Sequence, residues 1–270
     1  MSAPRFSPED YLCEEDSQLI LEIMNHEAAV KLLNWIRENK IDSIYDSVYQ
    51  SSYLQLNTKT APRLMEALQT ACAWFGVEPM PPVYVLRDFD DTVTIGGISE
   101  PFLLISGRYL SELEKQDPRL LLGVIAAQIA GIRVGHHRGL LLVWMLDTIS
   151  SLLPIPKPVM MALDALLNDW KRCRVYTCDR AMHLVTGDYS LTLRGILSTV
   201  ASGELMDRMA LGTPADGYRQ QVQAFMEGSV LDDFVNLLNS AISDTGWLPL
   251  RCQKIAQFAG VKEQEGLNVS

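Results

Sequence analysis

The stretch from Leu120 to Ile132 constrains the fold more than any other part of the chain. Its only polar side chain is Gln128. The preceding Asp117-Pro118 is typical of a helix start, with Asp as the N-cap and Pro in the first turn. A helix that is apolar on every side has no face to present to water, so it lies at the centre of a domain. The sequence therefore predicts a buried central helix that begins after Asp117.

Helices are predicted on both sides of this segment. Apolar residues at helical spacing indicate one or two helices over 16–40, and another over 60–75 that Gly76 closes. Residues 158–259 continue as successive helical patterns with short connections. The chain is therefore expected to be mostly helical.

Strands are predicted only between these helical regions. The runs 83–86 and 102–105 are β-rich and bounded by Pro, Asp and Gly, and 91–97 fits a third, edge-like strand. We find no internal repeat and no linker. We therefore expect a single α+β domain, mostly α, with a small mixed β-sheet and a buried central helix. The two ends are expected to be tails, over residues 1–13 and 260–270.

Composition excludes some classes of partner. The 270 residues carry a formal net charge of −10, without a basic run, which argues against binding nucleic acid. The five cysteines are widely spaced, with no C-x-x-C pair, as in a protein of a reducing compartment. They read as packed thiols, and Cys178 has no recognisable base for a nucleophilic role. Residues 1–15 lack the apolar core of a secretion signal, so we expect a cytoplasmic protein.

An apolar stretch raises the question of a membrane. Leu140 to Leu153 is strongly apolar but only 14 residues long, whereas a spanning helix needs about 20. The proline-rich segment 154–158 then breaks the chain, and a second apolar helix follows over 159–170. We predict a helical hairpin packed on the domain and no membrane span. The alternative use of this hairpin, Leu140–Leu163, is a contact between copies of the chain.

Four segments, at 83–107, 124–136, 174–181 and 247–251, resemble in the same order motifs of one family, the HtpX-like zinc metallopeptidases, which are gluzincins. Residues 124–136, V-I-A-A-Q-I-A-G-I-R-V-G-H, resemble its helix motif V-I-x-H-E-L-G-H-I-x-x-G-H. R-V-Y-T-C-D-R-A at 174–181 resembles S-E-x-S-C-D-R-A, which carries the third zinc ligand, and W-L-P-L-R at 247–251 resembles the closing T-H-P-x-x-x-L-R element. The strand region 83–107 is also similar. The resemblance covers about 14–259, is nearest to the soluble branch, and implies a gluzincin metallopeptidase-like fold.

The same resemblance implies a zinc site that this chain has lost. In such enzymes two His four residues apart and a Glu from a later helix bind zinc, and the Glu after the first His is the general base. The ligand positions here are Ala127, Gly131 and Val175, and the base position is Gln128. Methyl and isopropyl groups offer a metal no lone pairs, and an amide is no base near neutral pH. We therefore expect no metal and no other cofactor.

Some residues at family positions are retained: His136, Asp179, Arg180 and Arg251. In an active relative such groups would support the ligands or the transition state. Their alternative role here is to hold helices together. Asp179 and His183 have the spacing of one helix face, which leaves a chelating pair as a further alternative. Otherwise the histidines are expected at the surface or at helix ends.

The predicted edge strand suggests a ligand. In the peptidases the corresponding strand pairs with an extended substrate, and such pairing requires no zinc. We predict a polypeptide ligand along this edge; the alternative is an edge protected by its acidic flank, Asp88, Asp90 and Asp91. The candidate residues are Thr92, Val93, Thr94, Ile95 and Gly96.

These observations favour a catalytically inactive metallopeptidase homologue that acts by binding a protein or peptide, by self-association, or by both. One alternative is an active zinc-dependent endopeptidase with displaced ligands. Another is a helical oligomerisation or scaffold module that uses the Leu140–Leu163 hairpin. Each alternative predicts a different measurement: metal content for the first and oligomeric state for the second.

Overall fold

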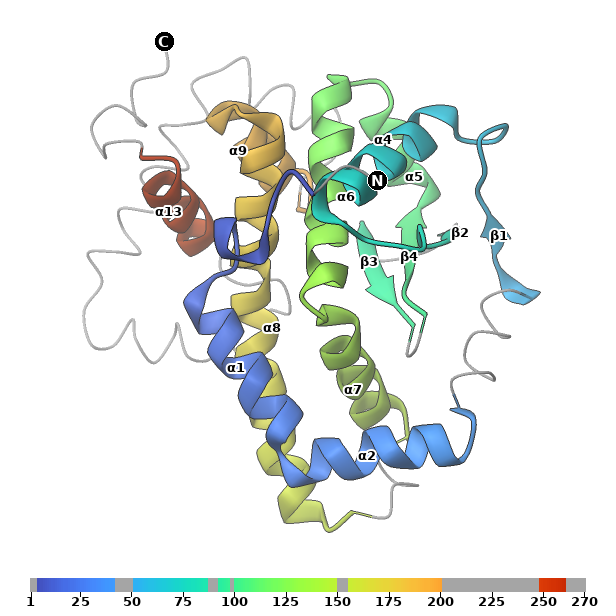
Figure 1. The fold of residues 1–270 in the computed structure, drawn as a ribbon, viewed down its shortest axis with the longest axis vertical. Coiled ribbons are helices and arrows are strands. Elements are labelled where there is room, and N and C mark those ends of the chain that lie inside the picture. The colour runs from blue at the N-terminus through green and yellow to red at the C-terminus, as the bar shows by residue number, and fades with distance from the viewer. Residues whose placement is uncertain are drawn as a thin grey trace.

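Helix α6 (Pro118–Arg133) runs through the middle of the molecule (Figure 1). The computed structural model describes residues 4–41, 51–86, 92–97, 100–149, 155–200 and 248–260. Asp117 is the N-cap of α6, and its side chain accepts a hydrogen bond from the backbone N–H of Arg119. Between Leu120 and Ile132 every residue is buried except Leu122 and Gln128. The prediction of a buried central helix is confirmed.

A small mixed sheet lies on one side of α6 (Figure 1). Its strands are β1 (Leu54–Gln55), β2 (Val83–Leu86), β3 (Val93–Gly96) and β4 (Phe102–Ser106), in the order β1-β2-β4-β3. Strands β2 and β4 are parallel, whereas β1 and β3 pair antiparallel to their neighbours. The three predicted strands are present, and β3 lies at one edge. The sequence did not predict β1, which is two residues long and exposed.

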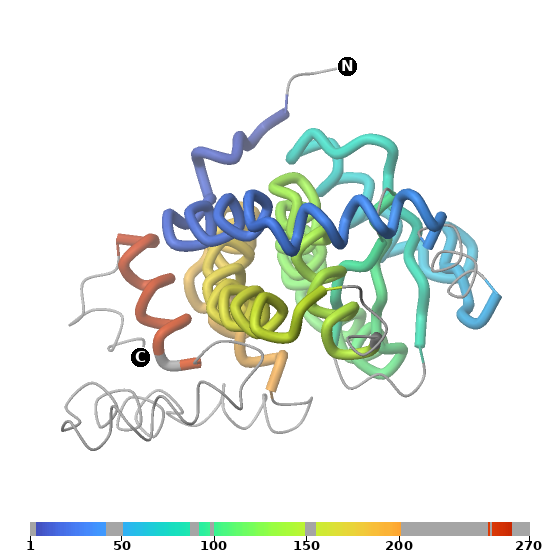
Figure 2. The backbone as a smooth tube through the Cα atoms, turned by 90° about the horizontal axis from the view of Figure 1, so that it is seen from below, coloured from blue at the N-terminus to red at the C-terminus, as the bar shows by residue number. Residues whose placement is uncertain are grey.

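The other described elements are helices, so the expected α+β class, mostly α, is confirmed. The longest is α8, which packs along α6 and α1. Figure 2 shows α1 and α2 following one another across the side of the central helices. The bounds are η1 (Pro8–Asp10), α1 (Glu14–Asn25), α2 (Glu27–Glu38), α4 (Pro62–Phe75), α5 (Gly107–Leu113), α7 (His136–Ile149), α8 (Lys157–Thr186), α9 (Tyr189–Leu197) and α13 (Leu248–Phe258).

The predicted apolar hairpin corresponds to α7 and the start of α8. It packs on α1 and α2 and forms a second hydrophobic core with them, in which Leu142 and Leu163 are fully buried. Its apolar face is therefore used within the chain. Among the described residues, no single helix is long and apolar enough to cross a membrane. Helix α6 and α7 up to Thr148 meet that requirement only as a pair, and the pair is bent by 84°.

The N-terminal segment differs from the expectation of a poorly ordered tail over 1–13. From Pro4 onward it lies against α4: the N–H of Phe6 donates to the carbonyl of Trp74 at 3.0 Å. Tyr11 is 1 % exposed and packs edge-on against Phe75. These aromatic side chains bury enough apolar surface to fix the segment. The predicted C-terminal tail lies outside the described residues, apart from Gly260.

Candidate functional site

A cavity of about 300 Å³ lies between the edge strand and the helices. Its walls come from β3 and from helices α5, α6, α7, α8, α9 and α13. Three of the four positions that the resemblance aligns with zinc-site residues line it, Ala127 and Gln128 on α6 and Val175 on α8. The retained Asp179 and Arg251 line it as well. Residues that the sequence motifs placed far apart along the chain therefore meet at one cavity.

The side chains at the predicted ligand positions do not fit a zinc ion. Ala127 and Val175 present a methyl and an isopropyl group to the cavity, without a lone pair for a metal. Gly131 does not line the cavity; a Cβ there would lie 3.0 Å from Nδ1 of His136. In the part of the chain that the structure describes, no group of three or more His, Cys, Asp or Glu side chains could hold a metal ion.

Two polar groups at the cavity have unsatisfied hydrogen-bonding atoms. Within the described residues, the buried Oε1 of Gln128 and the buried Nε of Arg174 have no hydrogen-bond partner. Both residues line the cavity. Leaving a buried donor or acceptor unpaired costs about 1–3 kcal/mol. A ligand that brings one N–H and one carbonyl oxygen would satisfy both atoms.

The ion pair between Asp179 and Arg251 closes one side of the cavity and joins α8 to α13. The guanidinium donates from Nε to Oδ2 at 2.9 Å and from Nη2 to Oδ1 at 2.8 Å. The residues are 2 % and 5 % exposed. Burial lowers the pKa of Arg251, but the Asp179 carboxylate outweighs this effect, so the pKa is raised and the guanidinium stays charged. Asp179 is thus committed to Arg251, while His183 contacts the hydroxyl of Thr192 at 3.2 Å.

His136 is the first residue of α7, a helix end as expected, but it is buried in a network directly behind the cavity and does not lie at the surface. It is fully buried, and its Nε2 lies 2.8 Å from Oδ2 of Asp16. The same carboxylate accepts hydrogen bonds from Nε1 of Trp170, at 2.8 Å, and from the hydroxyl of Thr177. The network therefore ties α1 to α7 and α8. Sequence reasoning missed Asp16, which lies 120 residues from His136.

Cys178 lines the cavity, and a base lies beside it. Its Sγ is 4.0 Å from Nδ1 of His136. The expectation that this thiol lacks a recognisable base is therefore wrong, because the base comes from a residue 42 positions earlier. Burial raises the pKa of Cys178 to about 12, so the thiol is protonated at neutral pH.

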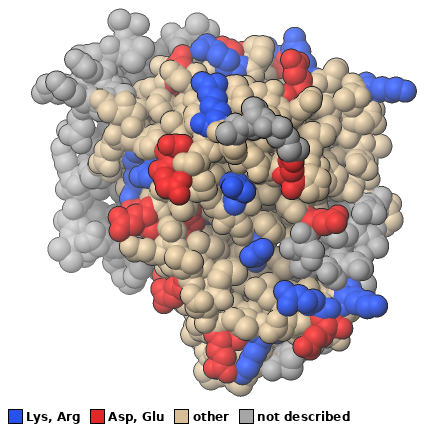
Figure 3. Space-filling model, in the orientation of Figure 1, with Lys and Arg blue, Asp and Glu red and all other residues tan. Residues whose placement is uncertain are grey.

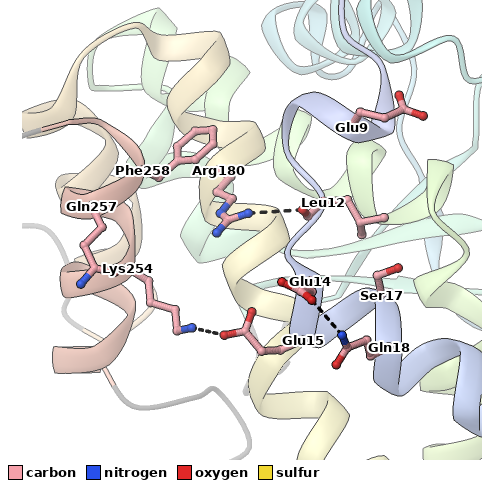
Figure 4. Close-up of a pocket in the computed structure, with 10 residues that line it drawn as sticks. All are labelled: Glu9, Leu12, Glu14, Glu15, Ser17, Gln18, Arg180, Lys254, Gln257 and Phe258. Carbon is pink, nitrogen blue, oxygen red and sulfur yellow. Dashed lines mark hydrogen bonds and ion pairs between the residues drawn. The ribbon is translucent and has the colours of Figure 1, made fainter.

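Arg180 lies elsewhere, in a separate open groove of about 790 Å³ between α1 and α13 (Figure 4). Its Nη1 donates to the carbonyl of Leu12 at 3.2 Å, and the guanidinium lies 5.1 Å from the ring centre of Phe258. Glu15 and Lys254 form an ion pair across the same groove. Arg180 therefore holds the N-terminal segment and α13 against α8, and is not part of the cavity.

The candidate peptide-binding edge forms one wall of the cavity through Thr92, Val93 and Thr94. The N–H of Ser106 on β4 donates to the carbonyl of Thr92 at 3.0 Å. Bonded and non-bonded pairs alternate along an antiparallel ladder, so the N–H and C=O of Val93 point away from β4. Ile95 is 3 % exposed, and Gly96 lies under the ring of Phe102, so the far end of the strand is core.

Comparisons with protein-family models, curated proteins and solved structures found no match to this chain. The acidic flank predicted to protect the edge lies outside the described residues. Figure 3 shows acidic and basic side chains interspersed over one face of the molecule.

Proposed function

We propose that this protein is a metallopeptidase-like protein without peptidase activity that binds an extended polypeptide along the start of β3. The observation that carries the proposal is that the cavity lined by Ala127, Gln128 and Val175 has the edge strand as one of its walls. The cavity could thus bind a polypeptide, whereas its residues Ala127, Gln128 and Val175 supply neither a metal ligand nor a base. The motif resemblance to zinc peptidases supports the same proposal.

The edge supports binding by strand addition. The main-chain N–H and C=O of Val93 point away from β4, and an added strand would pair with them. Helix α7 lies beside β3, and only residues 92–94 face the cavity, which restricts the pairing to that end. The unpaired atoms of Gln128 and Arg174 match the donor and acceptor of a peptide group.

The cavity itself would receive one side chain of the bound polypeptide. Its volume of about 300 Å³ is at the lower end of ligand pockets, which span roughly 300–1,000 Å³. Val124, Leu140, Val143 and Met182 supply apolar wall, and Lys171 and Arg174 supply cationic groups. These walls favour a long side chain with an apolar stem and a carboxylate or amide end.

The test uses fluorescein-labelled β-casein, an unstructured polypeptide, and follows binding by fluorescence anisotropy. We expect saturable binding and no cleavage. Val93→Pro removes the outward N–H and should abolish binding, whereas Val93→Thr keeps it and should bind like the natural chain. Ile95 is a poorer site for proline because its side chain is part of the core. Equal binding by both variants would overturn the proposed mode.

Zinc content distinguishes this proposal from the alternative of an active peptidase with displaced ligands. The protein would be prepared without chelators and equilibrated with excess zinc, with thermal melting followed in parallel. We expect metal-free protein whose melting temperature ignores zinc. One tightly held zinc per chain, with a stability gain that chelator reverses, would contradict the proposal and lead to protease assays.

A further inference from the structure

Three side chains from three helices form a row of contacts that begins at the cavity. Cys178 of α8 lines the cavity, and its Sγ lies 4.0 Å from Nδ1 of His136 on α7. The other ring nitrogen of His136 lies 2.8 Å from Oδ2 of Asp16 on α1. The order thiol, imidazole, carboxylate is the arrangement in which a base next to a nucleophile is itself oriented by a third group.

Asp16 determines which nitrogen of His136 carries the proton. The Asp16 carboxylate accepts hydrogen bonds from Trp170 and Thr177. Burial raises the pKa of Asp16, but His136 and these hydrogen bonds together outweigh burial, so the pKa is lowered and the group is ionised. An ionised carboxylate only accepts, so Nε2 of His136 is the donor. In the neutral form of the ring, Nδ1 then carries the lone pair, and this nitrogen faces Cys178.

We propose that Cys178 is a nucleophilic thiol of the cavity, with His136 as its general base and Asp16 as a positioning residue, and that it accepts an acyl group from a small ester or thioester. This activity goes beyond the binding of a polypeptide and does not depend on it. The position of Cys178 gives an entering carbonyl carbon direct access to Sγ from the cavity.

The step is balanced without any further reactant. As Sγ forms a bond to the carbonyl carbon, its proton passes to Nδ1 of His136, and the carbonyl oxygen gains negative charge. When the tetrahedral species collapses, the bond from carbon to the leaving oxygen or sulfur breaks, and His136 returns the proton to that leaving group. The products are the S-acyl protein and an alcohol or thiol.

The cavity supplies the other requirement, a donor for the developing negative charge. Arg174 lines the cavity, and within the described residues its buried Nε has no hydrogen-bond partner. A fixed donor in a site that excludes water stabilises an oxyanion strongly. The side chain lost at Gly131 matters as well, because a Cβ there would lie 3.0 Å from Nδ1 of His136 and crowd the base.

The chain contains its own control for the effect of the base. Cys72 on α4 is 5 % exposed and Cys178 is 6 % exposed. Burial raises the pKa of both thiols to about 12. For Cys72 burial is the sole cause of this rise, whereas Cys178 has the imidazole beside it. A difference in reactivity between these two thiols therefore reports two effects, access to the cavity and assistance by the base. The dependence of the reaction rate on pH distinguishes one effect from the other.

The experiment treats the full chain with p-nitrophenyl acetate, follows release of p-nitrophenol, and locates acetyl groups by mass spectrometry after digestion. We expect a burst of one equivalent per chain on Cys178, roughly a hundredfold faster than on Cys72. Base assistance should make the rate at Cys178 depend only weakly on pH, whereas a thiol without a base reacts tenfold faster for each unit of pH. Cys178→Ala should abolish the burst.

Asp16→Asn tests the positioning role. An amide that accepts from Trp170 must present its NH₂ group to Nε2 of His136, which moves the ring proton to Nδ1 and removes the base. We expect the burst rate at neutral pH to fall by roughly a hundredfold and to rise steadily with pH, in protein that melts cooperatively. If Asp16→Asn does not fold, the pH profile of the natural chain decides. Reaction of Cys178 no faster than Cys72, or a rate that rises tenfold per pH unit in the natural chain, would overturn the proposal.

Discussion

The imidazole of His136 occupies the space into which a side chain at Gly131 would project. A Cβ on Gly131 would lie 3.0 Å from Nδ1 of His136 and 3.0 Å from Cδ1 of Ile95. The family resemblance makes residue 131 a metal-ligand position, and here its lack of a side chain gives room to a buried histidine. The position that the resemblance predicts for a ligand and the buried network of His136 thus lie in contact with each other.

A branched side chain at residue 131 should therefore destabilise the protein. We expect Gly131→Val to lower the free energy of unfolding by about 1–3 kcal/mol, because it overpacks the contact between α6, β3 and α7. Gly131→Ala should be near neutral, since a gain in helix propensity of about 1 kcal/mol offsets milder crowding. Urea unfolding measures both. A Gly131→Val chain as stable as Gly131→Ala would contradict the close approach.

Breaking the ion pair between α8 and α13 should cost much more than removing both partners. Arg251→Met leaves the carboxylate of Asp179 buried and unpaired, and we expect a loss of about 3–5 kcal/mol. The double variant Asp179→Leu, Arg251→Met should recover most of that loss. Urea unfolding of the two single variants and the double variant completes the cycle. Additive losses would mean that the two residues do not interact as described.

Acid should destabilise the fold through His137. Burial lowers the pKa of His137 to about 4, and Arg138 and His136 add to the effect. The unfolded chain, with a pKa near 6.5, binds this proton first, so stability is lost as the pH falls from about 6.5 to 4. We expect His137 to contribute roughly 1–3 kcal/mol to that loss. His137→Gln should flatten the dependence of the unfolding free energy on pH over this interval; an unchanged slope would contradict the assignment.

The apolar hairpin should behave as core. Leu142 is fully buried, and we expect Leu142→Ala to lower the free energy of unfolding by about 2–5 kcal/mol. Met161 is 64 % exposed, so Met161→Glu should change stability by less than about 0.5 kcal/mol. Sedimentation of the natural chain and Met161→Glu tests self-association. An assembly in the natural chain that Met161→Glu dissociates would identify the hairpin as a contact between copies.

Local sequence patterns predicted the helices and strands whose own residues show whether they are buried or exposed. Helix α6 is apolar on every side, so its burial did not depend on knowing its neighbours. Strand β3 followed from a short β-rich run between turn residues. Strand β1 has two exposed residues and no pattern of its own, and it exists because β2 is there to pair with it.

The candidate site was predictable only in part. The motif resemblance placed Ala127, Gln128 and Val175 at one site, and they share a cavity. The resemblance also placed Arg180 at this site, but Arg180 lines another groove. Successive residues of a helix such as α8 point in different directions and so meet different neighbours. The link from Asp16 to His136 depends on how α1 crosses α8, and no local pattern encodes a contact between residues 120 positions apart.

Helix α8 contacts both α1 and α13, and this determines when the site can exist during synthesis. Asp16 bonds to Trp170 and Thr177, and Arg251 bonds to Asp179. Before residue 251 has emerged from the ribosome, α6 and α8 can already be present. Asp179 then still lacks its partner Arg251. The cavity can therefore close only after residue 251 has emerged from the ribosome, whatever order the other helices follow.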